Sequence, residues 1–345
     1  MNSITNIGLD IAKDVFHVFA TNQEGIPVIS RKLKRGDVMP FMANVPPCTV
    51  GIEACNTGHH WARALSALGH TVKLIHPHYV KAFVKRGKSD AIDAEAINEA
   101  VSRRGMRFVP IKSVDQQATT MIFRARTLLV RQRIQASNAL RNHLSELGII
   151  ANAGMHNIKI LAAIVRDHEK HGLPKTALVA LDIMVHQIEN LAAQIHALDR
   201  EILRLARADE DMRRLMTVPG IGPVTAAAVR TAVVDPNAFK SAKHFAAWLG
   251  LTPKISSSGG TTVLGRISKM GDGTLRSLLV SGATSAIRIA KGDEQTGRWL
   301  LRLKERKPFK VVAVALANKM ARIIWALLVK GGIYNEPPFA STSSA

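Results

Sequence analysis

The chain has 345 residues, which is long enough for two or three domains that each bury a core. Its 47 lysine and arginine residues outnumber its 26 aspartate and glutamate residues, and the formal net charge of +21 predicts attraction to a polyanion such as nucleic acid. Only two cysteines occur, Cys48 and Cys55, so a disulfide framework is not expected and a reducing cytoplasm is the natural compartment.

Neither a membrane span nor a secretion signal is expected from the sequence. The most apolar stretch, residues 311–329, is interrupted by Asn318, Lys319 and Arg322, which indicates an amphipathic or buried helix. The acidic residue Asp10 near the N-terminus argues against a signal segment. We therefore expect a cytoplasmic protein with no membrane partner.

Residues 1–110 alternate strand and helix signals. Strands are expected at residues 4–10, 15–21, 28–33, 49–54 and 71–75, and helices at 59–68, 78–85 and 90–103. The first three strands are joined by short polar turns, which indicates an antiparallel meander, whereas helices separate the later strands and imply parallel crossovers. This order predicts an α/β domain with a ribonuclease-H-like fold.

Four carboxylates stand out in this domain. Asp10 and Glu53 each end a short apolar run, which is how a strand delivers a side chain to one edge of a sheet. Asp90 and Asp93 are three residues apart at the start of a helix, so both point from one face, about 5–6 Å apart. Like charges brought together repel unless hard cations lie among them, and oxygen ligands suit Mg²⁺ or Mn²⁺. The pattern predicts two-metal phosphoryl transfer.

Residues 111–210 are expected to form a basic helix and a coiled coil. Residues 103–141 carry nine lysines and arginines against one acid, Asp115. So lopsided a ratio favours contact with phosphates, although an ordinary solvated helix face is the alternative. The arginines assigned to this contact are Arg124, Arg126, Arg131 and Arg133.

A heptad repeat begins at Leu181. All eight a and d positions over four heptads are apolar, namely Leu181, Met184, Ile188, Leu191, Ile195, Leu198, Ile202 and Leu205. This predicts a coiled coil, either with a second chain in a homo-oligomer, dimer or tetramer, or with an antiparallel helix of the same chain at residues 116–147.

Residues 211–335 are expected to form a third, mostly helical domain. The run Val218-Pro219-Gly220-Ile221-Gly222-Pro223 precedes an alanine-rich helix and resembles a helix-hairpin-helix, a clamp for the DNA backbone. Amides around Gly220 and Gly222 would then hold a phosphate, while a plain interhelical turn is the alternative. The Pro- and Ser-rich residues 336–345 are expected to be a disordered tail.

A serine-rich stretch, Ile255-Ser256-Ser257-Ser258-Gly259-Gly260, follows in this domain. Its composition predicts a flexible loop. Three cations, Lys254, Arg266 and Lys269, flank it and are placed to grip a scissile phosphate, and a flexible loop lets a hydroxyl reach a site built elsewhere.

These motifs together resemble the DEDD transposases of bacterial insertion sequences. The members concerned are the bridge-RNA-guided recombinases of the one-ten and eleven-eleven groups, which are related to a pilin-gene invertase. The residues that carry the resemblance are Asp10, Glu53, Asp90 and Asp93, the central coiled coil, the turn at 218–222 and the blocks Gly250-Leu251-Thr252-Pro253, Ser258-Gly259 and Ser268-Lys269-Met270-Gly271-Asp272.

The resemblance implies a RuvC-like domain whose four acids bind Mg²⁺, and a transposase domain whose serine attacks DNA to form a covalent phosphoserine link. That serine falls on Ser258. The resemblance also implies three kinds of partner: double-stranded DNA at the element ends and target, a structured noncoding guide RNA, and further copies of the chain. It places the protein in the bacterial cytoplasm, at the nucleoid during activity.

Our hypothesis is a DNA recombinase with a composite site, in which the acids and Ser258 come from different domains, either of one subunit or of two. The nearest alternative is a RuvC-like Holliday-junction or ribonuclease-H-type nuclease, in which the acids activate water and no serine takes part. A second alternative is an architectural nucleic-acid-binding protein without catalysis.

Overall fold

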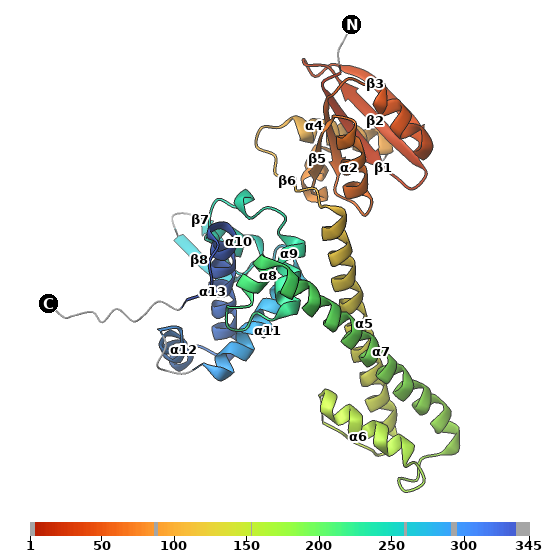
Figure 1. The fold of residues 1–345 in the computed structure, drawn as a ribbon, viewed down its shortest axis with the longest axis vertical. Coiled ribbons are helices and arrows are strands. Elements are labelled where there is room, and N and C mark those ends of the chain that lie inside the picture. The colour runs from red at the N-terminus through yellow and green to blue at the C-terminus, as the bar shows by residue number, and fades with distance from the viewer. Residues whose placement is uncertain (1–3, 86–88, 153, 259–260, 291–294, 336–345) are drawn as a thin grey trace, which may run out of the picture. The chain divides into compact units, whose positions relative to one another are not determined.

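The computed structural model describes residues 4–85, 89–152, 154–258, 261–290 and 295–335. The chain divides into two compact units, residues 1–117 and 118–345 (Figure 1). The first unit contains a mixed sheet with helices and the second is mostly helical, as the sequence predicts. The predicted disordered tail, 336–345, lies outside the described residues.

A six-stranded mixed sheet forms the centre of the first unit. Its strands are β1 (Asn6–Ile11), β2 (Val15–Thr21), β3 (Pro27–Lys34), β4 (Thr49–Glu53), β5 (Thr71–Ile75) and β6 (Phe108–Val109). The spatial order is β3-β2-β1-β4-β5-β6, with β1, β2 and β3 antiparallel, β4 and β5 parallel to β1, and β6 antiparallel. The predicted meander followed by parallel crossovers is confirmed.

The helices of this unit are α1 (Val38–Ala43), α2 (Gly58–Ala67), α3 (Pro77–Val80) and α4 (Asp90–Ser102), with 3-10 turns at Arg35–Asp37 and Lys81–Phe83. The sequence did not predict α1, because Pro40 reads as a helix breaker. A proline is tolerated there since first-turn amides have no partner within the helix. The predicted helix at 78–85 is shorter, and β6 was missed because two residues carry no periodicity.

Each face of the sheet is covered by different helices. Alternate residues of β1, Ile7 and Leu9, are fully buried in a core shared with α1 and α2. Because side chains alternate along a strand, Gly8 and Asp10 face the other way, toward α4. The face that carries the acids is therefore the face that α4 covers.

Among the described residues the second unit holds nine α-helices and two strands. They are the greater part of α5 (Val114–Glu146), then α6 (Met155–Arg166), α7 (Lys175–Ala208), α8 (Glu210–Leu215), α9 (Pro223–Ala232), α10 (Ala242–Trp248), the β7 (Pro253–Ser258) and β8 (Thr261–Ile267) hairpin, α11 (Gly273–Ile289), α12 (Gln295–Arg306) and α13 (Phe309–Lys330), besides a 3-10 turn at Pro236–Ala238.

The predicted heptad helix is α7, and its apolar stripe packs within the chain. Leu181 and Ile188 share a core with Leu140 and Leu144 near the end of α5, and with α6. At the opposite end of α7, Asp199 accepts a 2.5 Å hydrogen bond from Arg126, near the start of α5. The two helices therefore run antiparallel (Figure 1), and the partner of this stripe is a helix of the same chain.

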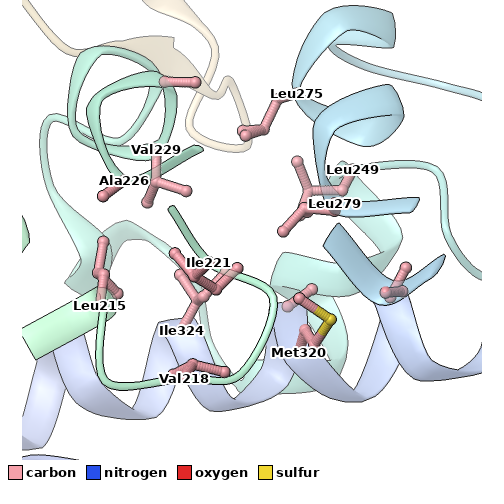
Figure 2. Close-up of a cluster of buried hydrophobic side chains, with 14 of the residues drawn as sticks. Leu215, Val218, Ile221, Ala226, Val229, Leu249, Leu275, Leu279, Met320 and Ile324 are labelled. Carbon is pink, nitrogen blue, oxygen red and sulfur yellow. The ribbon is translucent and has the colours of Figure 1, made fainter. Parts of the chain in front are cut away.

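The larger core of the second unit forms around α13. Met320 and Ile324 of α13 meet Leu279 of α11 and residues of the turn before α9, among them Val218 and Ile221 (Figure 2). Among the described residues α13 is the one helix long and apolar enough to cross a membrane by length and composition. Its inner face lies in this core, as predicted for a buried helix.

Candidate active site

Asp10 and Glu53 lie at one edge of the sheet. β1 and β4 are parallel, with Leu9 directly beside Ile52, so each acid follows at the carboxyl end of its strand. Both acids are half-buried. The sequence prediction that two strands deliver these acids to one edge is consistent with this register.

The other two acids begin α4. Ser89 caps the helix by accepting a hydrogen bond from the Ile92 amide at 3.4 Å, so Asp90 and Asp93 occupy the first turn. Asn98, further along the same helix and buried, donates to the Phe19 carbonyl at 3.2 Å on β2. This contact fixes α4 on the sheet, with its acidic first turn toward the edge that carries Asp10.

Two glycines allow α4 to approach the sheet closely. A Cβ on Gly8 would lie 2.0 Å from the Ala94 carbonyl oxygen, and a Cβ on Gly51 would lie 2.8 Å from the Val101 Cβ. Each glycine precedes an acid by two residues, so glycine and acid share one face of their strand. The backbone of α4 thus lies directly against β1 and β4, on the face from which Asp10 and Glu53 project.

Electrostatics shows that the acids of this unit interact. The pKa of Asp10 is raised from 3.8 to about 6, first by burial and then by the charges of Asp93, Asp90 and Glu53. The pKa of Glu53 is also raised, first by burial and then by Asp93, against a lowering by His76. Within the described residues no lysine or arginine forms an ion pair with Asp10, Glu53 or Asp93.

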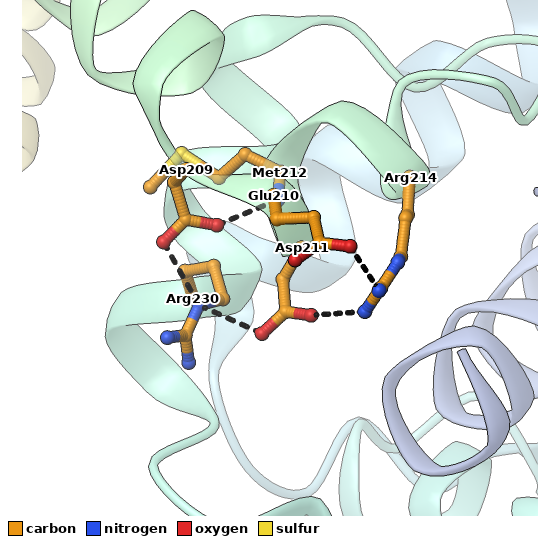
Figure 3. Close-up of polar contacts among 6 residues, drawn as sticks. All are labelled: Asp209, Glu210, Asp211, Met212, Arg214 and Arg230. Carbon is orange, nitrogen blue, oxygen red and sulfur yellow. Dashed lines mark hydrogen bonds and ion pairs between the residues drawn. The ribbon is translucent and has the colours of Figure 1, made fainter. Parts of the chain in front are cut away.

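A second acidic cluster lies in the second unit, and unlike the acids of the first unit its members pair with arginines (Figure 3). Asp209 caps α8 through the Met212 amide at 2.8 Å and lies 3.4 Å from Arg230, which also pairs with Asp211 at 3.5 Å. Arg214 pairs with Asp211 at 3.2 Å and with Glu210. These acids are compensated by arginines, so they stabilise helix ends and do not form a centre of repulsion.

The donor set of the first unit suits a hard divalent cation. All four groups are carboxylates, and burial together with the charges of the other three raises the pKa of Asp10, an effect that a bound cation would oppose. As they stand, the described residues bring no three His, Cys, Asp or Glu side chains close enough together to hold an ion. Asp90 is 62% exposed, so packing does not fix its carboxylate.

The structure adds one residue that the sequence did not single out. His17 of β2 is the direct cross-strand neighbour of Asp10, and its Nε2 lies 3.7 Å from Asp90 Oδ2. The register of the meander is the signal that would have revealed it, because an antiparallel neighbour points to the same face.

The serine-rich stretch forms a strand, which corrects the expectation of a flexible loop. Ser256 and Ser257 lie in β7 and pair with Val263 and Thr262 of β8, while Ser258 pairs with Thr261 at the end of the hairpin. The β-branched residues of β8 supply the partner strand that a run of serines cannot supply alone. Gly259 and Gly260, part of the predicted loop, lie outside the described residues.

The base of this hairpin is held by the segment that follows it. A Cβ on Gly271 would lie 2.1 Å from the Trp248 carbonyl oxygen, so the two backbones meet there. Arg276 of α11 donates to the carbonyls of Leu249 at 3.0 Å and Met270 at 2.8 Å. The block around Gly271 therefore anchors the hairpin, and the cations Lys254, Arg266 and Lys269 at its base are exposed.

The four arginines of α5 that were predicted to bind phosphates differ in how exposed they are to solvent. Arg124 and Arg131 are exposed. Arg126 is paired with Asp199, and the Nε of Arg133 is buried without a hydrogen-bond partner among the described residues. Arg124 and Arg131 are thus the two best placed to meet a nucleic acid.

The two glycines of the turn before α9, Gly220 and Gly222, differ in the space around them. Gly220 has φ +86° and a Cβ there would lie 2.4 Å from the Gly282 carbonyl oxygen, so packing alone requires a glycine. Gly222 is exposed and a Cβ there would meet nothing within 4 Å. Only Gly222 therefore leaves room for a ligand.

A mixed sheet with acids gathered toward one edge, in a chain of net charge +21, fits an enzyme that acts on nucleic acid. Comparison with known proteins specifies the kind. A sequence model described as the Transposase IS116/IS110/IS902 family matches residues 212–296, and a model for DEDD transposases of the IS110 type matches residues 7–149. The chain belongs to the IS116/IS110/IS902 family of transposases.

Individual relatives agree with this assignment. The transposase for insertion sequence element IS1328 of Yersinia enterocolitica is 40% identical over 97% of this chain and 100% of its own length. The transposase for IS1111A of Coxiella burnetii is 36% identical over 97% of this chain and 92% of its own. The pilin gene-inverting protein of Moraxella bovis is 26% identical over 94% and 96%. The predicted resemblance is confirmed.

The protein is therefore an insertion-sequence transposase, an enzyme of DNA recombination. Transposases act on DNA, and the DEDD class depends on divalent metal ions.

Proposed function

We propose that this transposase cuts and rejoins DNA through a covalent phosphoserine link to Ser258, with Asp10, Glu53, Asp90 and Asp93 as ligands of Mg²⁺, for which Mn²⁺ can substitute. One observation carries the proposal: in the first unit, burial and then the charge of neighbouring acids raise the pKa of Asp10 and of Glu53, and neither has a lysine or arginine partner among the described residues. Groups kept in mutual repulsion lower stability, so their placement in an enzyme points to function.

We further propose that the first unit is a RuvC-like domain of the ribonuclease-H type. Its support is the strand order β3-β2-β1-β4-β5 with a crossing helix that carries acids. We also propose a central helical domain, residues 111–210, whose α5 and α7 form an antiparallel coiled coil. It is followed by a transposase domain, residues 211–335, whose turn at 218–222 is helix-hairpin-helix-like.

The acids prepare the first unit for phosphate chemistry. When bound, a divalent cation would supply positive charge to a phosphate oxygen and lower the pKa of a nearby hydroxyl. Asp10 and Glu53 come from strand ends and are half-buried, so their positions are set by the sheet. Asp90 and Asp93 come from a helix start held by Asn98, so they close on the same edge. The rigid sheet thus orients half of the ligands.

In the proposed reaction, the oxygen of Ser258 forms a bond to the phosphorus of one DNA strand while the bond from phosphorus to a sugar oxygen breaks. The serine loses its proton and the departing sugar oxygen gains one, so charge balances. Because one phosphodiester replaces another, the energy of the bond is retained and the strands can be resealed without ATP. The exposed cations Lys254, Arg266 and Lys269 would offset the charge of the phosphate.

The proposed partners are double-stranded DNA, with its element ends and target, and a structured noncoding guide RNA encoded beside the gene. The net charge of +21 suits both polyanions. We also propose a homo-oligomer, dimer or tetramer, acting in the bacterial cytoplasm at the nucleoid. Since the heptad stripe of α7 is buried within one chain, other surfaces of the central helices would have to join the copies.

A covalent-adduct assay tests the reaction. Full-length protein is incubated with Mg²⁺, labelled DNA that carries the element end, and RNA transcribed from the flanking noncoding stretch, and then run on a denaturing gel. We expect labelled DNA attached to protein for the unaltered enzyme and for Ser256→Ala and Ser257→Ala, but not for Ser258→Ala. An adduct that persists in Ser258→Ala and disappears in Ser257→Ala would move the nucleophile by one residue.

The same assay separates the alternatives. A nuclease would give cleaved DNA without any adduct, and Ser258→Ala would cleave as well as the unaltered enzyme. An architectural protein would give neither product, and Asp10→Asn would leave its function intact. The recombinase proposal instead requires that Asp10→Asn retains DNA binding while losing both cleavage and adduct. Omission of the RNA tests guidance, since a guided enzyme then forms no adduct.

A further inference from the structure

A buried histidine lies beside the acids of the first unit. His17 is 7% exposed and stands on β2 as the direct cross-strand neighbour of Asp10. Antiparallel neighbours point to the same face, so its ring lies on the face covered by α4. Its flanking residues on β2, Phe16 and Val18, point into the opposite core. His17 is thus a polar side chain at a position where the sheet meets the acidic start of α4.

One atom of this ring lacks a hydrogen bond. The Nε2 of His17 is buried and has no hydrogen-bond partner among the described residues. The nearest opposite charge is Asp90 Oδ2 at 3.7 Å, which is within ion-pair distance but too long for a hydrogen bond. Buried polar atoms are rarely left without a partner, and a small rotation of the Asp90 side chain would supply one.

We propose that His17 is a positioning residue for Asp90: its Nε2–H donates a hydrogen bond to the Asp90 carboxylate and holds this carboxylate toward the other acids. Asp10 and Glu53 are oriented by the strands that carry them, whereas Asp90 is 62% exposed and has no comparable constraint. Groups that orient ligands from behind are a general feature of metal sites. This inference rests on the proposed role of the acids as metal ligands.

The surroundings of His17 argue against two other roles. A purely structural histidine would be expected to satisfy both ring nitrogens inside the fold, as His70 does: its Nδ1 accepts from the Cys48 amide at 3.3 Å and its Nε2 contacts the Met42 carbonyl at 3.1 Å. A histidine that contacts the DNA phosphate would be expected at the surface, yet the His17 side chain is 9% exposed. Contact with Asp90 accounts for both the burial and the direction of Nε2.

The test measures Mn²⁺ affinity of the full-length protein, without DNA, by calorimetry or by the electron paramagnetic resonance of free Mn²⁺. His17→Leu keeps the volume and removes the donor, and we expect it to weaken Mn²⁺ binding by about tenfold. His17→Gln places an N–H near the position of Nε2 and is expected to restore most of the affinity. His70→Leu is the matched control, because His70 is equally buried near the start of β4, at the other end of the strand from Glu53. It should lower thermal stability and leave the Mn²⁺ affinity unchanged.

A double-mutant comparison shows whether His17 acts through Asp90. In an Asp90→Asn background, His17→Leu should cause little further loss, because the carboxylate that it holds is absent. An equal tenfold loss in both backgrounds would overturn the proposal. So would His17→Leu protein that binds Mn²⁺ normally but fails to cleave DNA, which would place the ring on the phosphate.

A different result would contradict the underlying proposal that the four acids bind the metal ion. If Asp10→Asn binds Mn²⁺ as tightly as the unaltered protein, the acids are not the metal site. If Asp10→Asn loses Mn²⁺ binding while His17→Leu retains it, the acids are confirmed and only the role of His17 is wrong. Should His17→Leu fail to fold, His17→Phe, which also lacks the donor, replaces it in both Asp90 backgrounds, with His17→Gln again as the variant that keeps the donor.

Discussion

Replacement of Gly8 by alanine should separate α4 from the sheet. The new Cβ would lie 2.0 Å from the Ala94 carbonyl oxygen, and real Cβ atoms keep 3.0 Å or more from such atoms, so the helix must retreat by at least 1.0 Å. That retreat stretches the 3.2 Å hydrogen bonds that Asn98 makes with Phe19 and Thr21. Overpacking costs about 1–3 kcal/mol and each lost hydrogen bond about 1 kcal/mol, which together give about 3 kcal/mol.

The consequences can be measured on stability and on activity. A loss of about 3 kcal/mol should lower the melting transition of the first unit by about 10 °C or more in calorimetry. Because Asp90 and Asp93 move with α4, the cleavage rate should fall by about a hundredfold, the usual effect of a displacement of about 1 Å in an active site. Gly36→Ala is the control, since a Cβ there meets nothing within 4 Å. If Gly8→Ala melts and cleaves like the Gly36→Ala control, the reasoning about close approach is refuted.

Three further predictions concern charge, packing and DNA contact. Asp10 has a pKa of about 6 instead of 3.8 in the metal-free fold, so its ionisation penalises folding increasingly as the pH rises through this range. The full difference corresponds to about 3 kcal/mol, which we reduce to about 1–2 kcal/mol because the side chain is only half-buried. Asp10→Asn in EDTA should therefore gain this stability at pH 8 in denaturant titrations and lose the advantage as the pH falls toward 4, and a gain that is independent of pH would contradict the assignment. Gly220→Ala should destabilise the second unit by about 3 kcal/mol, because it combines a left-handed backbone with a contact of 2.4 Å. Gly222→Ala should melt normally, so any loss of DNA affinity in that variant reports a contact with DNA. Arg124→Gln with Arg131→Gln should weaken DNA binding and lower the slope of log affinity against log salt by about 2, one for each lost phosphate contact, whereas Arg126→Gln should mainly lower stability because it breaks the ion pair with Asp199. An unchanged salt slope in the double variant would remove α5 from the DNA interface.

The sequence alone determined most of the elements of the first unit and singled out its acids. β-Branched runs define β1, β2, β4 and β5, because period-two patterning is local and survives without knowledge of the fold. The position of Asp10 at the end of such a run, and the three-residue spacing of Asp90 and Asp93, follow from the same local geometry. The order of strands and helices restricted the topology further, since crossovers have few allowed forms.

The same local reasoning explains what was missed. Residues Ser256 and Ser257 have a loop-like composition, and only pairing with β8 makes them a strand. The heptad of α7 shows an apolar stripe but not which helix covers it, because a stripe is the same whether its partner belongs to the same chain or to another. Arg126 looks like any phosphate-binding arginine until Asp199, 73 residues away, is placed beside it.

Only the tertiary structure decided how closely the acids are held together. Gly8 and Gly51 carry no chemistry of their own, and their importance appears when α4 is seen against β1 and β4. His17 becomes a neighbour of the site through strand register, and the raised pKa of Asp10 depends on its burial and then on charges from α4 and β4. Periodicity along a chain predicts which residues share a face, whereas distances between faces arise from packing of residues that are far apart in sequence. The sequence therefore determined which groups are present at the site, and the fold determined their spacing.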